Sequence, residues 1–398
     1  MKEGGLQKKS SQDTAGAIER NSKASLLAVC RLLSANNNGF SLVEMLISLS
    51  IFSVLISVVF TSFDTQVKHT TREYKLAESD MEVGIAKSII ERDIGMAGYG
   101  LAEDYGTSIG DVTCPSGLRS SSFTGNFCIP AIAGATNANP DTLTLMGTAL
   151  GLETRAAQGW TYIASVDPTF RVWGDTREDV KGDATGNDVA ILMEPSTKRL
   201  LAQATEWLFK YDGSNATPAN RLTSRPTGIT FLNPAVGTLV YGFYSLGENV
   251  AAQPYYAVRY GLGGASPSNC AGGTQSLLRN ESRTTIPTNN GDPLLSCVLD
   301  FQVAFGLDSN EDGSIDLWDN GGVTAAGYDS QSLRRRFKQI RVYILMQSGN
   351  YDPNYSAPAN IDVGETLLGT GRSVPLTAAQ RKFRWRVVSL NVTPRNIR

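Results

Sequence analysis

An acidic loop at residues 308–319 carries the densest set of potential metal ligands in the chain. Calcium takes about six to eight oxygen ligands, and alternate residues of a tight loop supply them while a glycine permits the sharp turn. Gly313 stands at the position of that turn. The sequence therefore predicts a Ca²⁺ site whose ligands come from Asp308, Asn310, Asp312, Ser314 (through its carbonyl), Asp316 and Asp319.

Two features of this loop leave a simpler interpretation open. Asp319 replaces the longer glutamate that usually closes such a loop with both oxygens. The segment before the loop is strand-like, which argues against a pair of EF-hand helices. The alternative is an acidic, solvated hairpin turn.

The cysteines suggest disulfide bonds. Cys30 lies near the N-terminus, and the other four form two local groups in sequence. Even numbers of cysteines in an oxidising compartment favour disulfides, whereas the short C-x-x-C spacing of a zinc site is absent. Spacing alone leaves other pairings open, and we predict the local ones, Cys114–Cys128 and Cys270–Cys297.

Residues suited to catalysis are scarce. His69 is the only histidine of the 398 residues, which excludes a Ser-His-Asp triad, a Cys-His pair and multi-histidine metal chemistry. The chain has no P-loop, and no G-x-G-x-x-G follows a predicted strand. We therefore expect a protein that is not an enzyme.

Glu44 is a candidate for function because it stands at the start of a long apolar segment. Residues 45–63 carry no charge and would form a helix of roughly 28 Å, close to the thickness of a bilayer core. Acidic residues in a membrane helix are costly and usually functional. Basic residues dominate before this span, which predicts a cytoplasmic N-terminus and a domain on the outer side.

A secretory signal peptide is the first alternative for this segment. The apolar run is long for a signal peptide, no small-x-small cleavage site follows it, and the helical pattern continues beyond it. An uncleaved signal anchor is the second alternative. A different junction, Gly39-Phe40, precedes the apolar run.

The stretch Gly39-Phe-Ser-Leu-Val-Glu-Met-Leu46 resembles the prepilin signal of type IV pilins and type II secretion pseudopilins. The resemblance implies that prepilin peptidase cleaves between Gly39 and Phe40 and that the new amine is methylated. It also implies that Glu44 neutralises the Phe40 amine of a neighbouring subunit during assembly. The chain departs from the pattern before the junction, where Asn38 stands in place of the usual basic residue.

A long helix should follow the junction. No proline occurs in residues 40–97, and the glycines from Gly95 to Gly100 offer conformations that end a helix. An apolar stripe should pack this helix on a domain. Its members are Val67, Tyr74, Met81, Ile85, Ile89, Ile90 and Ile94.

After residue 100 the pattern changes to strands separated by glycine, proline, asparagine and serine. The predicted strands are Thr142–Met146, Val189–Met193, Thr238–Tyr244, Tyr255–Tyr260, Cys297–Gly306, Gln339–Met346 and Phe383–Val392. In the last one the apolar phase slips, which predicts a β-bulge near Val387–Val388. Residues 101–140 and 262–293 are rich in loop residues. The predicted fold class is α+β, with the long helix packed on an antiparallel sheet.

Within the pilin superfamily the chain resembles PilW-like minor pilins. Three stretches carry this resemblance: Arg92–Gly100, Val298–Asp308 and the pair of strands at 340–347 and 386–395. The resemblance implies three parts, namely a leader at 1–39, a helix at 40–98 that spans the membrane over about 40–63, and a β-rich domain at 99–398.

The same resemblance implies a structural subunit of a type IV pilus that helps to start assembly or acts at the tip, in adhesion or motility. Its partners would be other pilins and minor pilins through the helix, prepilin peptidase and a tip adhesin. It would reside in the inner membrane with a periplasmic domain and later in the extracellular pilus. The alternatives are a minor pseudopilin of type II secretion and a membrane-anchored, calcium-dependent binding protein.

A basic run at Arg334–Arg341 raises the question of DNA binding. The whole chain has a net charge of −2, which gives no electrostatic case for nucleic acid as the main partner. We predict instead a charged strand edge that discourages pairing between sheets.

Overall fold

The computed structural model consists of two compact units, residues 1–71 and 72–398. It describes residues 41–102, 131–134, 140–151, 160–165, 188–201, 208–211, 216–218, 234–245, 256–282, 288, 290–319, 334–365 and 371–397. The predicted leader, and with it the Gly39–Phe40 junction, lies outside these ranges.

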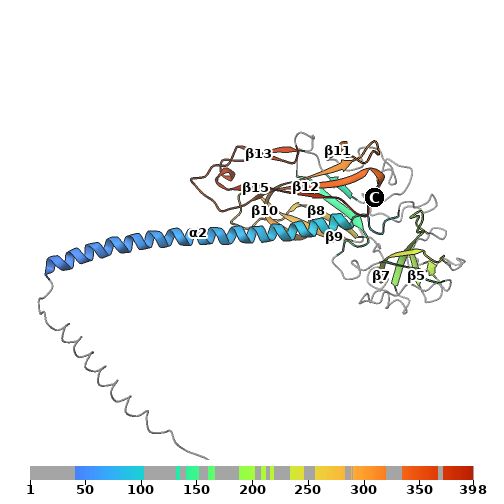
Figure 1. Ribbon diagram of the computed structural model, residues 1–398, viewed down its shortest axis with the longest axis horizontal. Coiled ribbons are helices and arrows are strands. Elements are labelled where there is room, and N and C mark those ends of the chain that lie inside the picture. The colour runs from blue at the N-terminus through green and yellow to red at the C-terminus, as the bar shows by residue number, and fades with distance from the viewer. Residues whose placement is uncertain are drawn as a thin grey trace, which may run out of the picture. The chain divides into compact units, whose positions relative to one another are not determined.

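One helix, α2 (Leu42–Met96), runs from the first unit into the second (Figure 1). Ser41 precedes it, and the Ser41 N–H donates to Glu44 Oε2 at 3.3 Å. Serine followed three residues later by glutamate is a capping box, in which the glutamate satisfies one of the free amides at the helix start. Among the described residues, α2 is the one helix long and apolar enough to cross a membrane, with a mean hydropathy of 2.4 in its most apolar window.

The helix ends where glycines were predicted to end it. Gly98 and Gly100 have φ angles of +81° and +69°, in the left-handed region that glycine adopts without strain. A Cβ on Gly98 would lie 2.8 Å from the Asn396 carbonyl oxygen. Asn396 in turn donates its side-chain N–H to the Gly95 carbonyl at 2.8 Å, so the C-terminal segment caps the helix.

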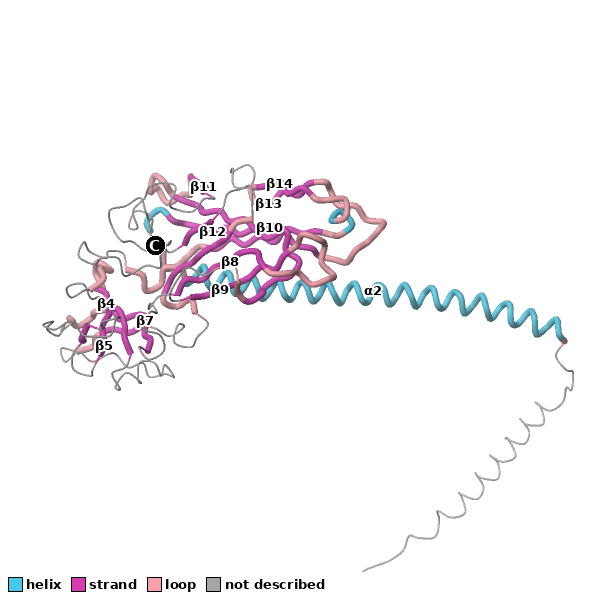
Figure 2. Tube along the Cα trace, turned by 180° about the vertical axis from the view of Figure 1, so that it is seen from behind, coloured by secondary structure: helices cyan, strands magenta, loops and turns pink. Residues whose placement is uncertain are grey.

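The main sheet of the second unit is antiparallel and has the order β1-β2-β8-β9-β10-β12-β15, with β11 paired to β10. Figure 2 shows these strands in magenta. Their bounds are Ala131–Gly134, Thr142–Gly147, Tyr256–Gly263, Gln275–Ser282, Asp292–Leu307, Phe337–Gln347 and Trp385–Val392, with β11 at Leu317–Asp319.

Two smaller sets of strands accompany the main sheet. One sheet has the order β3-β7-β4-β5-β6, with bounds Trp160–Tyr162, Leu239–Ser245, Asp188–Met193, Leu208–Tyr211 and Ala216–Pro218. The other is the hairpin of β13 (Asn360–Val363) and β14 (Arg372–Pro375). A 3₁₀ turn, η3 (Gln380–Lys382), leads into β15.

The main sheet is buried on both faces in its centre. On one face, Val83, Ala86, Ile90 and Ile94 of α2 belong to the same core cluster as residues of β2, β8, β9, β10, β12 and β15. On the other face, residues of β12 form a second cluster with the β13–β14 hairpin. The antiparallel sheet and its helix confirm the predicted α+β class.

The predicted packing stripe of the helix is correct only in part. Ile90 and Ile94 are fully buried, but Tyr74, Met81 and Ile85 are 71%, 66% and 55% exposed, and Val67 is also exposed. A seven-residue repeat drifts by about 20° per heptad on a straight helix. The buried face instead follows the three- and four-residue steps from Val83 to Ile94, so the heptad positions face solvent.

All seven predicted strands are present, with ends shifted by a few residues. The predicted bulge in the last strand is wrong, because β15 pairs with β12 without a register shift. Val388 and Leu390 face the helix side, whereas Trp385 packs against the cluster on the other face. On that face only Trp385 has apolar partners, while Val387 is exposed, so the apolar phase changes along the strand without a bulge. Strand β9 lies in a segment that was predicted to be loop-rich.

Candidate functional site

Of the three residues of the predicted site at the start of the helix (Gly39, Phe40 and Glu44), the structure describes Glu44. Its carboxylate is exposed and accepts the Ser41 N–H at the positive end of the helix dipole. Every residue from Ser41 to Thr71 is exposed. The first unit therefore presents one carboxylate followed by a long apolar surface, as the sequence predicts. Gly39 and Phe40 lie outside the described residues.

A buried ion pair fixes the other end of the helix to the sheet. Asp93 of α2 is 0% exposed, and its Oδ2 accepts hydrogen bonds from Arg279 Nε at 2.8 Å and from the Tyr260 hydroxyl at 2.5 Å. The arginine lies on β9 and the tyrosine on β8. Removing one member of a buried, hydrogen-bonded pair leaves the other charge uncompensated, so this contact decides how α2 docks.

Arg279 makes two further contacts within the second unit. Its remaining nitrogens donate to the Leu150 carbonyl and to Glu281, both at 2.8 Å. Burial opposes the charge on Arg279, but the neighbouring Asp93 carboxylate outweighs burial and raises the pKa of the guanidinium. Burial, together with the same carboxylate, also raises the pKa of Tyr260. The Arg279 guanidinium therefore stays charged and the tyrosine stays protonated.

The basic run lies elsewhere than predicted. Strand β12 is an interior strand between β10 and β15, so the prediction of a charged strand edge is wrong. Arg334 is buried and donates to the carbonyls of Leu101 and Ala102 at 2.9 and 3.2 Å. Because these carbonyls follow the helix end, Arg334 clamps the segment that leaves α2.

Three other residues of the basic run pair with the acidic loop, while Arg341 pairs with Glu365. Arg335 and Arg336 pair with Glu311 at 3.2 and 3.1 Å, and Lys338 Nζ lies 3.2 Å from Asp308 Oδ2. Sequence reasoning missed this because it treated the loop and the run as separate features. Charges of the two segments therefore pair with each other within the domain.

The acidic loop is held by its own hydrogen bonds. The amides of Asp312 and Gly313 donate to the Asp308 carboxylate at 3.0 and 2.8 Å, and Gly313 has the predicted left-handed φ of +98°. The Asp316 carboxylate accepts from the amide and hydroxyl of Ser309 at 2.7 and 2.8 Å. Burial would raise the pKa of Asp308, but the amides of Gly313 and Asp312, together with Lys338, hold this pKa below its usual value.

These contacts bear on the calcium prediction. No group of three or more His, Cys, Asp or Glu side chains that could hold a metal occurs in the described part of the chain. Lys338 already places a positive charge beside Asp308, the first predicted ligand. The Gly313 and Ser314 amides donate to the carboxylates of Asp308 and Asp312, respectively, and so shape the loop as an oxygen-rich turn. Calcium binding at Asp308–Asp319 thus stays a prediction, with Lys338 as a competitor for Asp308.

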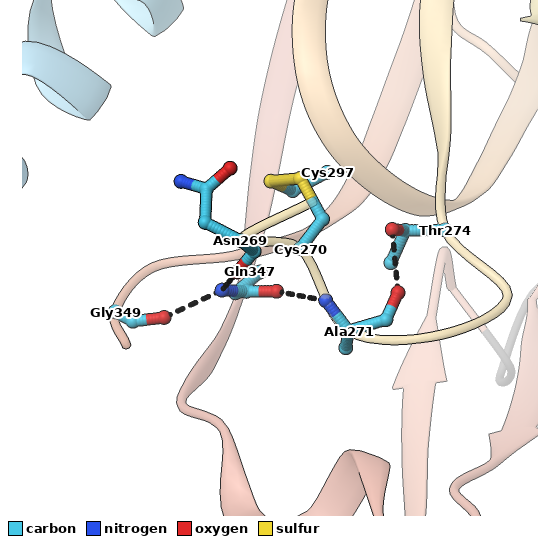
Figure 3. The surroundings of a disulfide bond; sticks show 7 residues. All are labelled: Asn269, Cys270, Ala271, Thr274, Cys297, Gln347 and Gly349. Carbon is cyan, nitrogen blue, oxygen red and sulfur yellow. Dashed lines mark hydrogen bonds between the residues drawn. A yellow bond between two sulfur atoms is a disulfide. The ribbon is translucent and has the colours of Figure 1, made fainter. Parts of the chain in front are cut away.

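One predicted disulfide is formed. Cys270 and Cys297 are bonded, with Cα atoms 5.2 Å apart (Figure 3). Cys297 has a φ of +56°, unusual for a residue other than glycine, and lies between register shifts in β10. Gln347 bridges this region, since its Oε1 accepts the Ala271 N–H at 2.7 Å and its Nε2 donates to the Gly349 carbonyl at 2.7 Å. Cys114 and Cys128 lie outside the described residues.

The structure also contains two buried aspartates that the sequence analysis did not predict. Asp141 and Asp300 are 1% and 0% exposed, and Arg372 neutralises only Asp300, at 2.9 Å. Asp141 accepts the Val303 N–H at 2.8 Å. Burial, opposed by this amide, raises the pKa of Asp141 to about 7, and burial also raises the pKa of Asp300.

Comparisons with known proteins gave two family matches and a match to a solved structure. The family of type IV pilus-assembly protein W (PilW) matches residues 265–396, and the prokaryotic N-terminal methylation motif matches residues 34–60. A type IV-like pilin from Thermus thermophilus aligns at 10% identity over 80% of this chain and 96% of its own, with a TM-score of 0.31. No curated protein sequence matches the chain.

The two family matches cover the features described above. The PilW match contains the disulfide, the acidic loop, Arg334 and the last two strands of the main sheet. The motif match contains Glu44 and most of the apolar span. The last third of the chain is therefore similar to the PilW family of type IV pilus-assembly proteins, and its N-terminus carries the methylation motif at the start of a helix whose first part is apolar enough to anchor the chain in a membrane.

Proposed function

We propose that the protein is a minor pilin that is made as a prepilin, cut between Gly39 and Phe40 and methylated on the new amine. The domain would then face the periplasm while the helix sits in the inner membrane. From there the subunit would enter a type IV pilus, at assembly initiation or at the tip. One observation supports this most: a single helix begins at the motif, is fully exposed over residues 41–71 and is locked into a domain by Asp93.

The helix start supports the proposed role of Glu44. The carboxylate now accepts the Ser41 amide, a weak, exposed hydrogen bond that a stronger donor can replace. A free amine at Phe40 would be such a donor, and attraction between opposite charges rises steeply in a low-dielectric bilayer. Glu44 would pair with the Phe40 amine of a neighbouring pilin, which selects subunits by charge before they pack.

Processing is tested by intact-mass measurement of the full chain made with and without an active prepilin peptidase. The proposal predicts a chain that begins at Phe40 and carries one added methyl group, found only with the peptidase. Gly39→Leu should block this product, whereas Asn38→Ala, next to the junction, should not. A mature chain that begins elsewhere, or one unchanged by the peptidase, would contradict the proposal.

A further inference from the structure

The last strand of the main sheet leaves one edge open. β15 pairs with β12 along its whole length and without a register shift. It is also the end member of the strand order. Among the residues that the structure describes, none hydrogen-bonds to the outer edge of Val387–Val392.

The pairing pattern identifies the backbone groups on the open edge. The Ser348 N–H donates to the Arg384 carbonyl at 2.8 Å, in register with the β12–β15 pairs. Hydrogen-bonded pairs alternate with non-bonded pairs along antiparallel strands. The even-numbered residues of β15 therefore direct their N–H and C=O groups to β12. The odd-numbered residues direct theirs outward, namely Val387, Ser389 and Asn391.

This edge lacks the usual protection against pairing. Natural edge strands are shielded by charged side chains, prolines, bulges or short length. The side chains of Val387, Ser389 and Asn391 are exposed and uncharged, and the strand is free of proline and bulges. The opposite edge of the sheet, by comparison, is the short strand β1 (Ala131–Gly134). An unprotected edge of this length is suited to accept a strand from another chain.

Positive charges stand at both ends of the open edge. Arg384 precedes it; its side chain is 39% exposed, lies 3.7 Å from the Asp352 carboxylate and stacks over the Tyr355 ring at 4.3 Å. Arg395 follows it and is exposed. The uncharged stretch between them, Val387–Asn391, spans about 17 Å in an extended strand.

The charges also argue against a second copy as the occupant. If two β15 strands paired antiparallel about Ser389, Arg386 of each would lie opposite Val392 of the other. Just beyond the strand ends, Arg384 of one copy would come near Arg395 of the other. Like charges so placed repel. A segment with acidic residues at both ends would instead place opposite charges there.

We propose that the open edge of β15 binds an extended segment of a partner protein in which acidic residues flank an uncharged centre. The outward N–H and C=O groups of Val387, Ser389 and Asn391 bind the backbone of this segment. Arg384 and Arg395 select its flanks. This inference does not depend on the function proposed above.

The test uses the purified full chain in detergent and two synthetic peptides. Both alternate threonine and valine in the centre, and their ends carry either two glutamates or two lysines. We expect fluorescence anisotropy to show at least about tenfold tighter binding of the glutamate peptide at low salt. Binding should also slow amide hydrogen exchange at Val387, Ser389 and Asn391, while the amides that face β12 are protected with or without peptide.

Ser389→Pro removes one outward N–H without breaking a bond to β12, so it should weaken binding of the glutamate peptide by about tenfold or more. Ser389→Thr, which keeps the N–H, is the matched control. If the proline variant does not fold, Val387→Glu serves instead, since its negative charge on the exposed edge repels the glutamate peptide and should weaken its binding.

Three results would overturn the proposal. They are no binding of the glutamate peptide, equal binding of both peptides, or binding that the edge variants leave unchanged. Sedimentation of the chain without peptide tests the other occupant. Self-association that Ser389→Pro abolishes would assign the edge to a second copy and would also contradict the proposal.

Discussion

The two halves of α2 share one unbroken helix but are built for different surroundings. Residues 42–71 are exposed on every side and mostly apolar. Residues 72–96 bury one face, which carries Val83, Ile90 and Asp93, the partner of Arg279. The first half has no partner in the described part of its own chain, whereas the second half is fixed by an ion pair and a packed core. The contrast shows that the second half is fixed in the domain, whereas the first half has the exposed apolar surface of a helix suited to membrane anchoring.

The largest expected effect comes from breaking the anchor of the second half. Asp93→Asn leaves the buried Arg279 with only the partly exposed Glu281 as a countercharge, so we expect a loss of about 3 kcal/mol in the free energy of unfolding. Urea unfolding, followed by the signals of the domain, measures it. Asp80→Asn on the same helix removes an exposed pair with Arg386 and should cost less than about 1 kcal/mol. Equal losses for the two variants would refute the special role of Asp93.

The disulfide comes next in expected size. Replacing both Cys270 and Cys297 by serine frees a loop of 27 residues, which costs about 3 kcal/mol in the chain-entropy model. A lower melting temperature under non-reducing conditions would agree with this. The first half of the helix should keep its membrane insertion, because the disulfide lies wholly in the second unit. An unchanged melting temperature would show that the bond does not stabilise the domain.

A pH-dependent effect is expected at Asp141. Its pKa in the folded state, about 7, lies above its ordinary value of 3.8. Between these two pH values the folded state therefore holds a proton that the unfolded state has lost. This group therefore lowers stability progressively as pH rises from about 4 to about 7. Asp141→Asn should stabilise the domain by about 1–3 kcal/mol at pH 8 and have little effect at pH 4. Melting curves at the two pH values decide, and an equal effect at both would count against the buried proton.

Calcium binding should have a smaller effect. At tenfold saturation a ligand that binds only the native state adds about 1.4 kcal/mol. The melting temperature should rise in millimolar calcium relative to chelator, and Asp312→Ala should abolish the rise while Asp292→Ala, outside the loop, should not. Lys338→Gln should strengthen binding because it frees Asp308. If calorimetry detects no heat of calcium binding and no variant changes the melting temperature, the loop is only an acidic turn.

How well the sequence predicts a feature of this molecule depends on how far apart its interacting residues lie along the chain. Local signals located the helix, its glycine end and seven strands, because periodicity and turn residues act over a few positions. Asp93 and Arg279 are 186 residues apart, and no local pattern connects them. Strand β9 was missed because its polar half, Arg279–Ser282, owes its place to that pair and to neighbouring strands. The interior position of β12 likewise follows from strand order, which composition does not encode.

The smallest expected effect on the domain concerns the exposed heptad positions. Tyr74→Ser and Met81→Ser remove large apolar side chains from the solvent-facing side of α2. Such surface changes usually alter stability by less than about 0.5 kcal/mol. If the exposed face serves other subunits, these variants should fold normally, as circular dichroism and urea unfolding would show, yet enter filaments less well. A marked loss of stability would place these side chains in the core.

The central claim, that the first half of the helix serves assembly while the second half serves the domain, is tested most directly at Glu44. The measurement is the amount of the protein in sheared pilus filaments, compared with the amount in the membrane, for wild type, Glu44→Gln and Glu73→Gln. Glu73 is an exposed acid of the same helix beyond the apolar span. The account predicts that Glu44→Gln is cleaved and inserted normally but depleted from filaments by about tenfold or more, while Glu73→Gln matches wild type. Normal incorporation of Glu44→Gln, or equal depletion of both variants, would contradict it.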